Sequence, residues 1–215
     1  MIADRSSFVK SALSLGLVAI IGTTLLSAVD LATEERIAQQ ERRVVLEQLA
    51  RIIPPDRYDN ALQDDWYAFS DETSFPGGQR VVAYRARRQG QPVAVILRFA
   101  AMDGYSGPIG LLAGIEADGR LAGVRVTSHR ETPGLGDGIE AEKSDWIRAF
   151  DGRSLGAPPV AEWTVRRDGG AFDQLTGATI TPLAVVKAVR RALEYHELHG
   201  NELFEAPAGR EGKVP

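Results

Sequence analysis

The stretch RVVAYRARRQGQPVAVILRFAA, residues 80–101, decides the fold, because its pattern predicts two β-strands joined by a turn. The two runs, Arg80–Arg87 and Val93–Ala101, are rich in Val, Ile, Tyr and Phe, which favour extended backbone. Between them, Gln89-Gly90-Gln91 contains the glycine that is typical of a tight turn. The stretch therefore predicts a β-hairpin.

A second hairpin is predicted downstream, with strands over Leu111–Glu116 and Leu121–Thr127 and a turn at Asp118-Gly119. The two hairpins together predict a four-stranded antiparallel sheet. Between them, the loop Gly104-Tyr105-Ser106-Gly107-Pro108 is too rich in glycine to continue a strand. We expect a close approach of this backbone to a ligand.

Helical and mixed patterns follow the sheet. A short helix is expected over Ile139–Phe150 and a further strand over Glu162–Arg166. The last helix is expected to begin at Thr181-Pro182, with Thr as the cap and Pro in the first turn, and to run through His196. The fold class is α+β, an antiparallel sheet with flanking helices.

The N-terminal part begins with an uncharged run, SALSLGLVAIIGTTLLSAV, over residues 11–29. A helix needs about 20 residues to cross a bilayer core, so this run predicts one transmembrane anchor. A cleavable signal peptide is the alternative, but the run is longer than the usual signal-peptide core. Helical spacing over Thr33–Ile53, ended by Pro54-Pro55, predicts a short stalk. Basic residues on both sides leave the orientation of the span open.

The composition fits one domain with an appendage, since 215 residues with 44% hydrophobic and 25% charged residues suffice for one core. A net charge of −4 without a basic stripe argues against nucleic-acid binding. The expected parts are an N-terminal segment, the anchor, a juxtamembrane helix, the α+β domain and a disordered tail, over residues 1–10, 11–29, 30–57, 58–205 and 206–215.

Few groups in the sequence suit catalysis or metal binding. The absence of cysteine excludes disulfides, Fe–S clusters and thiolate metal sites. His196 and His199 stand three residues apart, but the sequence offers no evident third ligand, so we predict no metal site. Neither a catalytic triad nor a nucleotide-binding glycine pattern is evident, and we predict no catalytic residue.

The segment suited to a ligand is Asp173-Gln174-Leu175-Thr176-Gly177-Ala178-Thr179, directly before the last helix. Its Gly-Ala pair leaves the backbone unobstructed between two hydroxyl residues. The N-terminus of the following helix offers free N–H groups and partial positive charge to a phosphate. An ordinary capped turn would have the same features, so these residues alone leave both interpretations open.

This segment resembles the flavinylation signature of the FMN-binding domain shared by the G subunit of the Rnf/Rsx electron transport complex and the C subunit of the sodium-pumping NADH:quinone reductase. In that signature an Asp, two variable residues, Ser or Thr, Gly, Ala and Thr end in the threonine esterified to FMN. The matching residues here are Asp173, Thr176, Gly177, Ala178 and Thr179.

Other stretches resemble the G subunits in order and spacing: Gly104–Gly107, His129–Asp137, Ser144–Trp146 and Asp168–Asp173. Gly-Leu-Gly-Asp at 134–137 and the length of the chain favour the Rnf/Rsx protein over the longer quinone-reductase protein. The similarity covers the chain from the N-terminal span to about His196.

The resemblance implies roles for the motif. Thr179 is expected to hold FMN through a phosphate ester, and Asp173 to be needed by a flavin transferase. Thr176 occupies the first hydroxyl position of the signature, and Gly177 with Ala178 keeps the approach to the threonine clear.

The resemblance also implies that the loop Thr132–Gly136 lies against the isoalloxazine ring, with Leu135 offering an apolar contact and Thr132 a hydrogen bond. A purely structural Pro-Gly turn is the alternative. Tyr105 and Trp146 are expected to be core or interface aromatics instead of groups that stack on the flavin.

The function implied is that of an electron-transfer subunit in a complex of the bacterial inner membrane that couples ferredoxin and NAD redox chemistry to cation transport. The partners implied are the other Rnf/Rsx subunits, a flavin transferase and the membrane, with the FMN domain periplasmic and the N-terminus cytoplasmic. Two alternatives are a membrane-tethered structural or assembly subunit without flavin, and an FMN domain released by signal cleavage.

Overall fold

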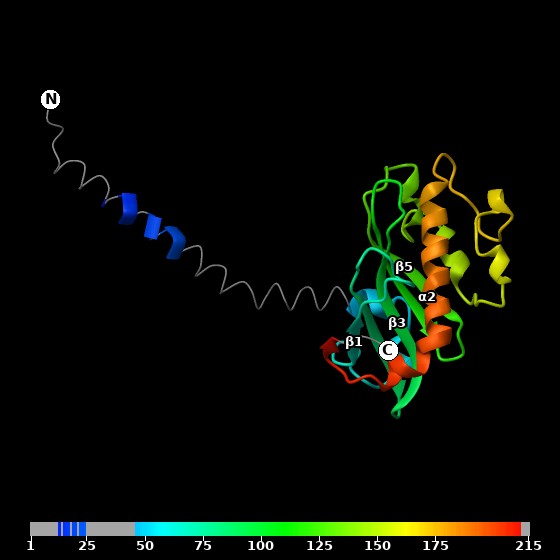
Figure 1. Ribbon diagram of the computed structural model, residues 1–215, viewed down its shortest axis with the longest axis horizontal. Coiled ribbons are helices and arrows are strands. Elements are labelled where there is room, and N and C mark those ends of the chain that lie inside the picture. The colour runs from blue at the N-terminus through cyan, green and yellow to red at the C-terminus, as the bar shows by residue number, and fades with distance from the viewer. Residues whose placement is uncertain (1–12, 14, 18, 21, 25–45, 212–215) are drawn as a thin grey trace. The chain divides into compact units, whose positions relative to one another are not determined.

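The computed structural model describes residues 13, 15–17, 19–20, 22–24 and 46–211 (Figure 1). The chain forms two compact units, Met1–Val45 and Leu46–Pro215. The described residues of the first unit are helical, and the hydroxyls of Thr23 and Thr24 donate to backbone carbonyls one turn earlier.

No helix within the described residues is both long enough and apolar enough to cross a membrane. Parts of the predicted anchor over residues 11–29, and most of the predicted stalk, lie outside the described residues. The anchor therefore stays a prediction.

The second unit is built on a six-stranded sheet in the order β5-β4-β3-β2-β1-β6. Strands β1 to β5 pair antiparallel along the sheet, and β6 adds in parallel to β1. Both predicted hairpins are confirmed, whereas β1 and β6 were not predicted. The strands are β1 (Trp66–Phe69), β2 (Val81–Arg88), β3 (Gln91–Ala101), β4 (Ile109–Glu116), β5 (Leu121–Ser128) and β6 (Arg210–Glu211).

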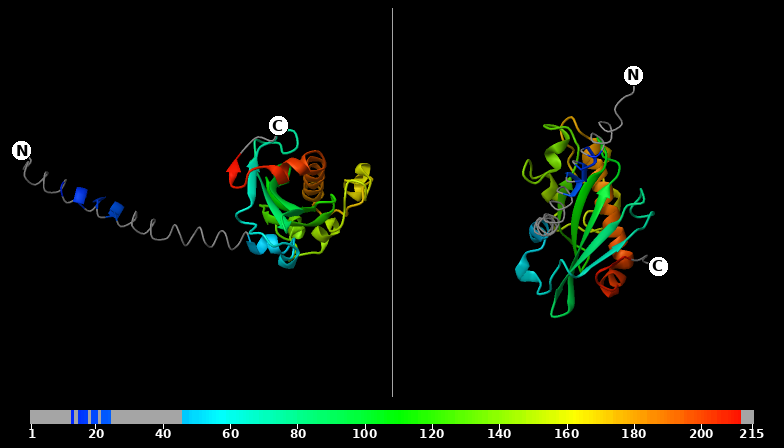
Figure 2. Two further views of the ribbon diagram at one scale, coloured as in Figure 1. Left: turned by 90° about the horizontal axis from the view of Figure 1, so that it is seen from below. Right: turned by 90° about the vertical axis from the view of Figure 1, so that its left-hand side faces the viewer.

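Both faces of the sheet are covered (Figure 2). Helix α2 (Ile180–Glu205) packs on one face, where alternate residues of β3 such as Val95 and Leu97 enter the main core. Residues 46–65 cover the other face. A Cβ atom added to Gly114 on β4 would lie 2.3 Å from Cγ2 of Ile52, so the absent side chain lets this segment pack directly on the strand. The compact unit thus begins before residue 58.

Two elements predicted after the sheet were wrong. In place of one helix over Ile139–Phe150, two 3₁₀ helices form, η2 (Gly136–Ile139) and η3 (Trp146–Phe150). The Ser144 hydroxyl donates to the carbonyl of Gly138 at 2.6 Å and accepts from the amide of Trp146, and such local bonds compete with a continuous helix.

The strand predicted over Glu162–Arg166 is also absent from the described residues, where η4 (Val160–Glu162) and η5 (Arg166–Asp168) form. Val165 makes a single bridge with Phe172. This bridge is parallel, a tight turn at Gly169 with φ of 84° lies between the two residues, and no longer ladder forms among the described residues here.

Helix α2 begins earlier and ends later than predicted. Thr179, not Thr181, is its cap residue, and Pro182 is tolerated within the first turn because amides there have no intrahelical acceptor. The helix ends at Glu205 instead of near His196. Strand β6 then lies within the segment for which the sequence predicted disorder.

Candidate functional site

A cavity of about 230 Å³ lies where the loop after β5 meets the N-terminus of α2. Three segments that are far apart in the sequence form its walls. Five of the seven predicted site residues line it, namely Thr132, Leu135, Gly177, Ala178 and Thr179. The remaining lining residues are Tyr105, Glu131, Gly136, Ile180 and Thr181.

The motif presents Thr179 by means of a tight turn. The amide of Ala178 donates to the carbonyl of Leu175 at 3.0 Å, and Gly177 has φ of 78°. A type II turn requires this positive φ at its third residue, which explains the glycine. Thr179 follows as the cap of α2, half-buried, and its side chain makes no capping hydrogen bond. Its hydroxyl is thus not used by the helix.

The opposite wall is the turn Thr132-Pro133-Gly134-Leu135. The amide of Leu135 donates to the carbonyl of Thr132 at 3.1 Å, and Gly134 has φ of 77°, again as a type II turn requires. A Cβ atom on Gly177 would lie 3.1 Å from Cδ2 of Leu135, so the two turns touch. The Pro-Gly segment is therefore both a structural turn and a wall of the cavity.

Asp137 stabilises this second turn through its side-chain carboxylate. Lys143 donates to its Oδ2 atom at 2.8 Å, and the amide of Gly134 donates to Oδ1 at 2.8 Å. These bonds, with Lys143 the largest cause, lower the pKa of Asp137 below its ordinary value. The turn is thereby held by a carboxylate that stays ionised at neutral pH.

Glu131 was missed as a site residue by the sequence analysis, which quoted it only as part of a longer stretch. It is 4% exposed, and its Oε1 atom accepts from the amide of Ser106 at 3.0 Å. Its Oε2 atom accepts from the hydroxyl of Thr181 at 2.5 Å. No local pattern marks such a residue, because its partners lie 25 positions before it and 50 after it.

Two predicted site residues do not line the cavity. Thr176 is exposed in its turn. The carboxylate of Asp173 is also exposed and pairs with Arg166, with Oδ1 2.8 Å from Nη1. The backbone carbonyl of Asp173 accepts from the indole N–H of Trp146. Asp173 is therefore not part of the cavity wall.

The two aromatic residues differ in their surroundings. Trp146 is buried in the core, as expected. Tyr105 is 69% exposed and lines the cavity, so it is not a core residue. Tyr105, Leu135 and Ile180 are all large, apolar and exposed, and together they form an apolar rim around the opening.

The donor set suits a phosphorylated aromatic molecule. The first-turn amides of α2 have no intrahelical acceptor, and the helix N-terminus favours an anion. The apolar rim provides surface for a planar ring, and Gly177, which has no side chain, lies in the same wall as Thr179. Within the part of the chain that the structure describes, no cluster of three His, Asp or Glu side chains could hold a metal ion.

Comparison with known proteins agrees with this geometry. Residues 104–194 match the FMN-binding domain family, and this segment contains every residue that lines the cavity. Residues 1–52 match the RnfG N-terminal region.

Three relatives are similar over almost their full length, and each is named as the G subunit of an ion-translocating oxidoreductase complex. The protein of Pseudomonas aeruginosa is 48% identical over 97% of this chain and 99% of its own. The protein of Shewanella loihica is 42% identical over 96% of this chain and 98% of its own. The protein of Vibrio cholerae is 42% identical over 95% of this chain and 97% of its own.

Proposed function

The chain belongs to the family of G subunits of ion-translocating oxidoreductase complexes, and we propose that it carries FMN bound covalently to Thr179. In this proposal the flavin relays electrons between ferredoxin and NAD redox couples, and the complex couples that flow to cation transport.

The observation that carries the proposal is the position of Thr179. It ends the motif that begins at Asp173, caps α2 and lines the cavity with a hydroxyl that the helix does not use. A phosphate ester at this atom would lie at the N-terminus of α2, where free amides and the helix dipole stabilise negative charge.

The size of the cavity also favours a covalent bond. Clefts that enclose a drug-sized ligand measure about 300–1,000 Å³. At about 230 Å³ this cavity is smaller, so part of an FMN molecule would lie outside it. An ester bond retains a cofactor that the cavity alone encloses poorly, and it does so in every redox state.

The protein residues have separate roles in this proposal. FMN supplies the electron-transfer chemistry when bound. Leu135 provides an apolar contact and Thr132 a hydrogen-bonding hydroxyl from the facing turn, while Gly177 and Ala178 keep the approach to Thr179 open. Asp173, exposed at the start of the motif, is the residue that a flavin transferase would recognise.

The membrane assignments belong to the same proposal. The uncharged run over residues 11–29 would be a single-pass anchor in the bacterial inner membrane, with residues 1–10 cytoplasmic and the FMN domain periplasmic. The partners would be the other subunits of the complex, which the names of the relatives support, and the flavin transferase during maturation.

The test is to produce the full chain with a flavin transferase in an exporting host and to compare wild type, Thr179→Ala and the control Thr73→Ala. Wild type should give a fluorescent band on a denaturing gel, with FMN mass on the peptide that contains Thr179. Thr179→Ala should give none, whereas Thr73→Ala, which removes an exposed hydroxyl outside the motif, should keep FMN at Thr179.

Unmodified wild type, in the presence of a transferase that modifies a known substrate, would contradict the proposal. That outcome would favour a membrane-tethered structural or assembly subunit without flavin.

A further inference from the structure

We propose that Glu131 is a positioning residue of the flavin site, which joins the three walls of the cavity and presents a negative charge to the bound flavin. The expected effect of the Glu131 charge on the flavin rests on the proposed function. The role of Glu131 in joining the cavity walls does not require bound flavin.

The first observation is that one carboxylate connects all three walls. Glu131 itself begins the wall that continues with Thr132. Its Oε1 atom accepts a hydrogen bond from the amide of Ser106, which follows Tyr105. Its Oε2 atom accepts one from the hydroxyl of Thr181 in the first turn of α2. Thr179, two residues before Thr181, is thereby connected to both facing loops.

The second observation is that this junction is closed to solvent. Glu131 is 4% exposed and Thr181 is fully buried. A Cβ atom on Gly136 would lie 2.9 Å from Oε2 of Glu131 and 3.1 Å from the hydroxyl oxygen of Thr181, so the glycine lets the loop lie directly over this pair. Buried hydrogen bonds that water cannot replace hold their partners in one arrangement.

The third observation concerns charge. Among the described residues that line the cavity, Glu131 is the one with a charged side chain. Its two carboxylate oxygens accept hydrogen bonds from the amide of Ser106 and the hydroxyl of Thr181. A fixed negative charge near a flavin opposes the gain of negative charge on reduction, so Glu131 should favour the oxidised form.

The experiment uses the full chain with three variants. Glu131→Ala removes both hydrogen bonds, and Glu131→Gln can keep both contacts but removes the charge. Glu142→Gln is the matched control, because its carboxylate is 64% exposed and pairs with Arg51 away from the cavity. Thr181→Val, with Thr181→Ser as its conservative partner, tests the bond to α2 alone.

The first measurement is amide hydrogen exchange of the unmodified chain, which requires no flavin. Glu131→Ala should accelerate exchange at Ser106 by roughly tenfold or more, and Glu131→Gln should restore most of the protection. The second is the initial rate of flavin transfer, which Glu131→Ala and Thr181→Val should lower several-fold, with Thr181→Ser near wild type.

The third measurement separates charge from structure. On the flavinylated protein, Glu131→Gln should shift the redox equilibrium toward reduced FMN by roughly tenfold, and Glu142→Gln should leave it unchanged. Wild-type exchange at Ser106 in Glu131→Ala, or an unshifted equilibrium in Glu131→Gln, would overturn the proposal. Failure of wild type to accept FMN would instead overturn the proposed function, while the exchange measurement would still decide the structural role.

Discussion

The indole N–H of Trp146 donates to the backbone carbonyl of Asp173 at 2.6 Å, across 27 positions of sequence. Trp146 also packs edge-on against Phe150, with ring centroids 5.5 Å apart. Phe150 in turn stacks on Phe172, the residue before Asp173, at 4.6 Å. The aromatic core therefore holds the start of the segment that ends in Thr179.

Trp146→Phe should destabilise the domain and slow flavin transfer. Phe keeps much of the aromatic packing but leaves the Asp173 carbonyl without this donor, at a cost of about 1 kcal/mol in the free energy of unfolding. The matched control is Trp163→Phe, which loses an equivalent bond to the carbonyl of Pro158. Denaturant unfolding should show a lower free energy of unfolding in both variants. Flavin transfer should be slower only in Trp146→Phe. Equal transfer rates would contradict this coupling.

Gly177→Ala should impair flavin transfer more than its loss of stability explains. Its φ of 78° is unfavourable for alanine, by about 1 kcal/mol, and its Cβ atom would press on Leu135 at 3.1 Å. Gly119→Ala is the control, since its φ is 84° and a Cβ atom there meets nothing within 4 Å. Thermal unfolding should show similar losses of stability in Gly177→Ala and Gly119→Ala. Transfer rates that match between the two variants would argue against an effect specific to the motif.

Arg85→Met should cost about 3 kcal/mol in the free energy of unfolding. Arg85 is buried, and its Nη2 atom lies 2.5 Å from Oδ1 of Asp65. Its guanidinium also donates to the carbonyls of Leu203 and Ala206 at the end of α2. Breaking a buried pair leaves the partner charge uncompensated, which costs about 3–5 kcal/mol, although Asp65 here also keeps Arg87.

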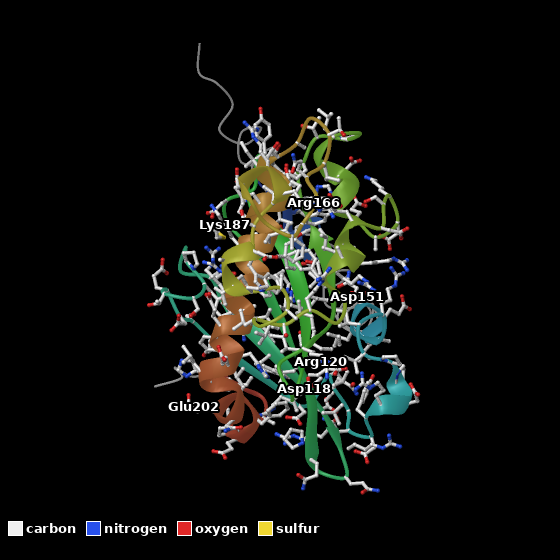
Figure 3. The ribbon with its side chains drawn as sticks, turned by 90° about the vertical axis from the view of Figure 1, so that its right-hand side faces the viewer. Asp118, Arg120, Asp151, Arg166, Lys187 and Glu202 are labelled. Carbon is white, nitrogen blue, oxygen red and sulfur yellow. The ribbon has the colours of Figure 1, made fainter. Side chains whose placement is uncertain are left out.

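Arg120→Met is the control for Arg85→Met, because its pair with Asp118 is exposed and such pairs contribute about 0–1 kcal/mol. Figure 3 shows Arg120 beside Asp118, toward the opposite end of the domain from Arg166. Urea denaturation of both variants measures the difference. A loss in Arg85→Met no larger than in Arg120→Met would show that the buried pair contributes little.

Acidic pH should destabilise the domain through His196. Burial lowers the pKa of His196 below its ordinary value of 6.5, although the charge of Asp118 partly opposes this shift. Below about pH 6.5 the unfolded chain binds a proton that the folded domain does not, so the free energy of unfolding falls until the folded pKa is reached.

His196→Gln should remove that part of the pH dependence. Leu193 is a buried residue of the same helix, so Leu193→Ala should lower stability but keep the slope of the free energy of unfolding against pH. Denaturant unfolding between pH 5 and 7.5 measures both, and an unchanged slope in His196→Gln would refute the assignment.

The sequence by itself determined the central part of the sheet. The two hairpins depend on β-favouring runs and on turns such as Gln89-Gly90, whose positive φ values of 52° and 77° suit a two-residue hairpin turn. Such preferences act between neighbouring residues, so they are visible in the sequence. The α+β class was likewise evident from local patterns, whereas the motif from Asp173 to Thr179 stood out through its resemblance to a known signature.

Only the tertiary structure decided where the last helix begins and which residues form the cavity. Thr181 looked like the cap, but its hydroxyl bonds to Glu131, and Thr179 takes the capping position instead. Asp173, expected from the sequence to be needed by a flavin transferase, pairs with Arg166 outside the cavity. These outcomes depend on contacts between segments that are distant in the sequence, and no local backbone preference specifies such partners.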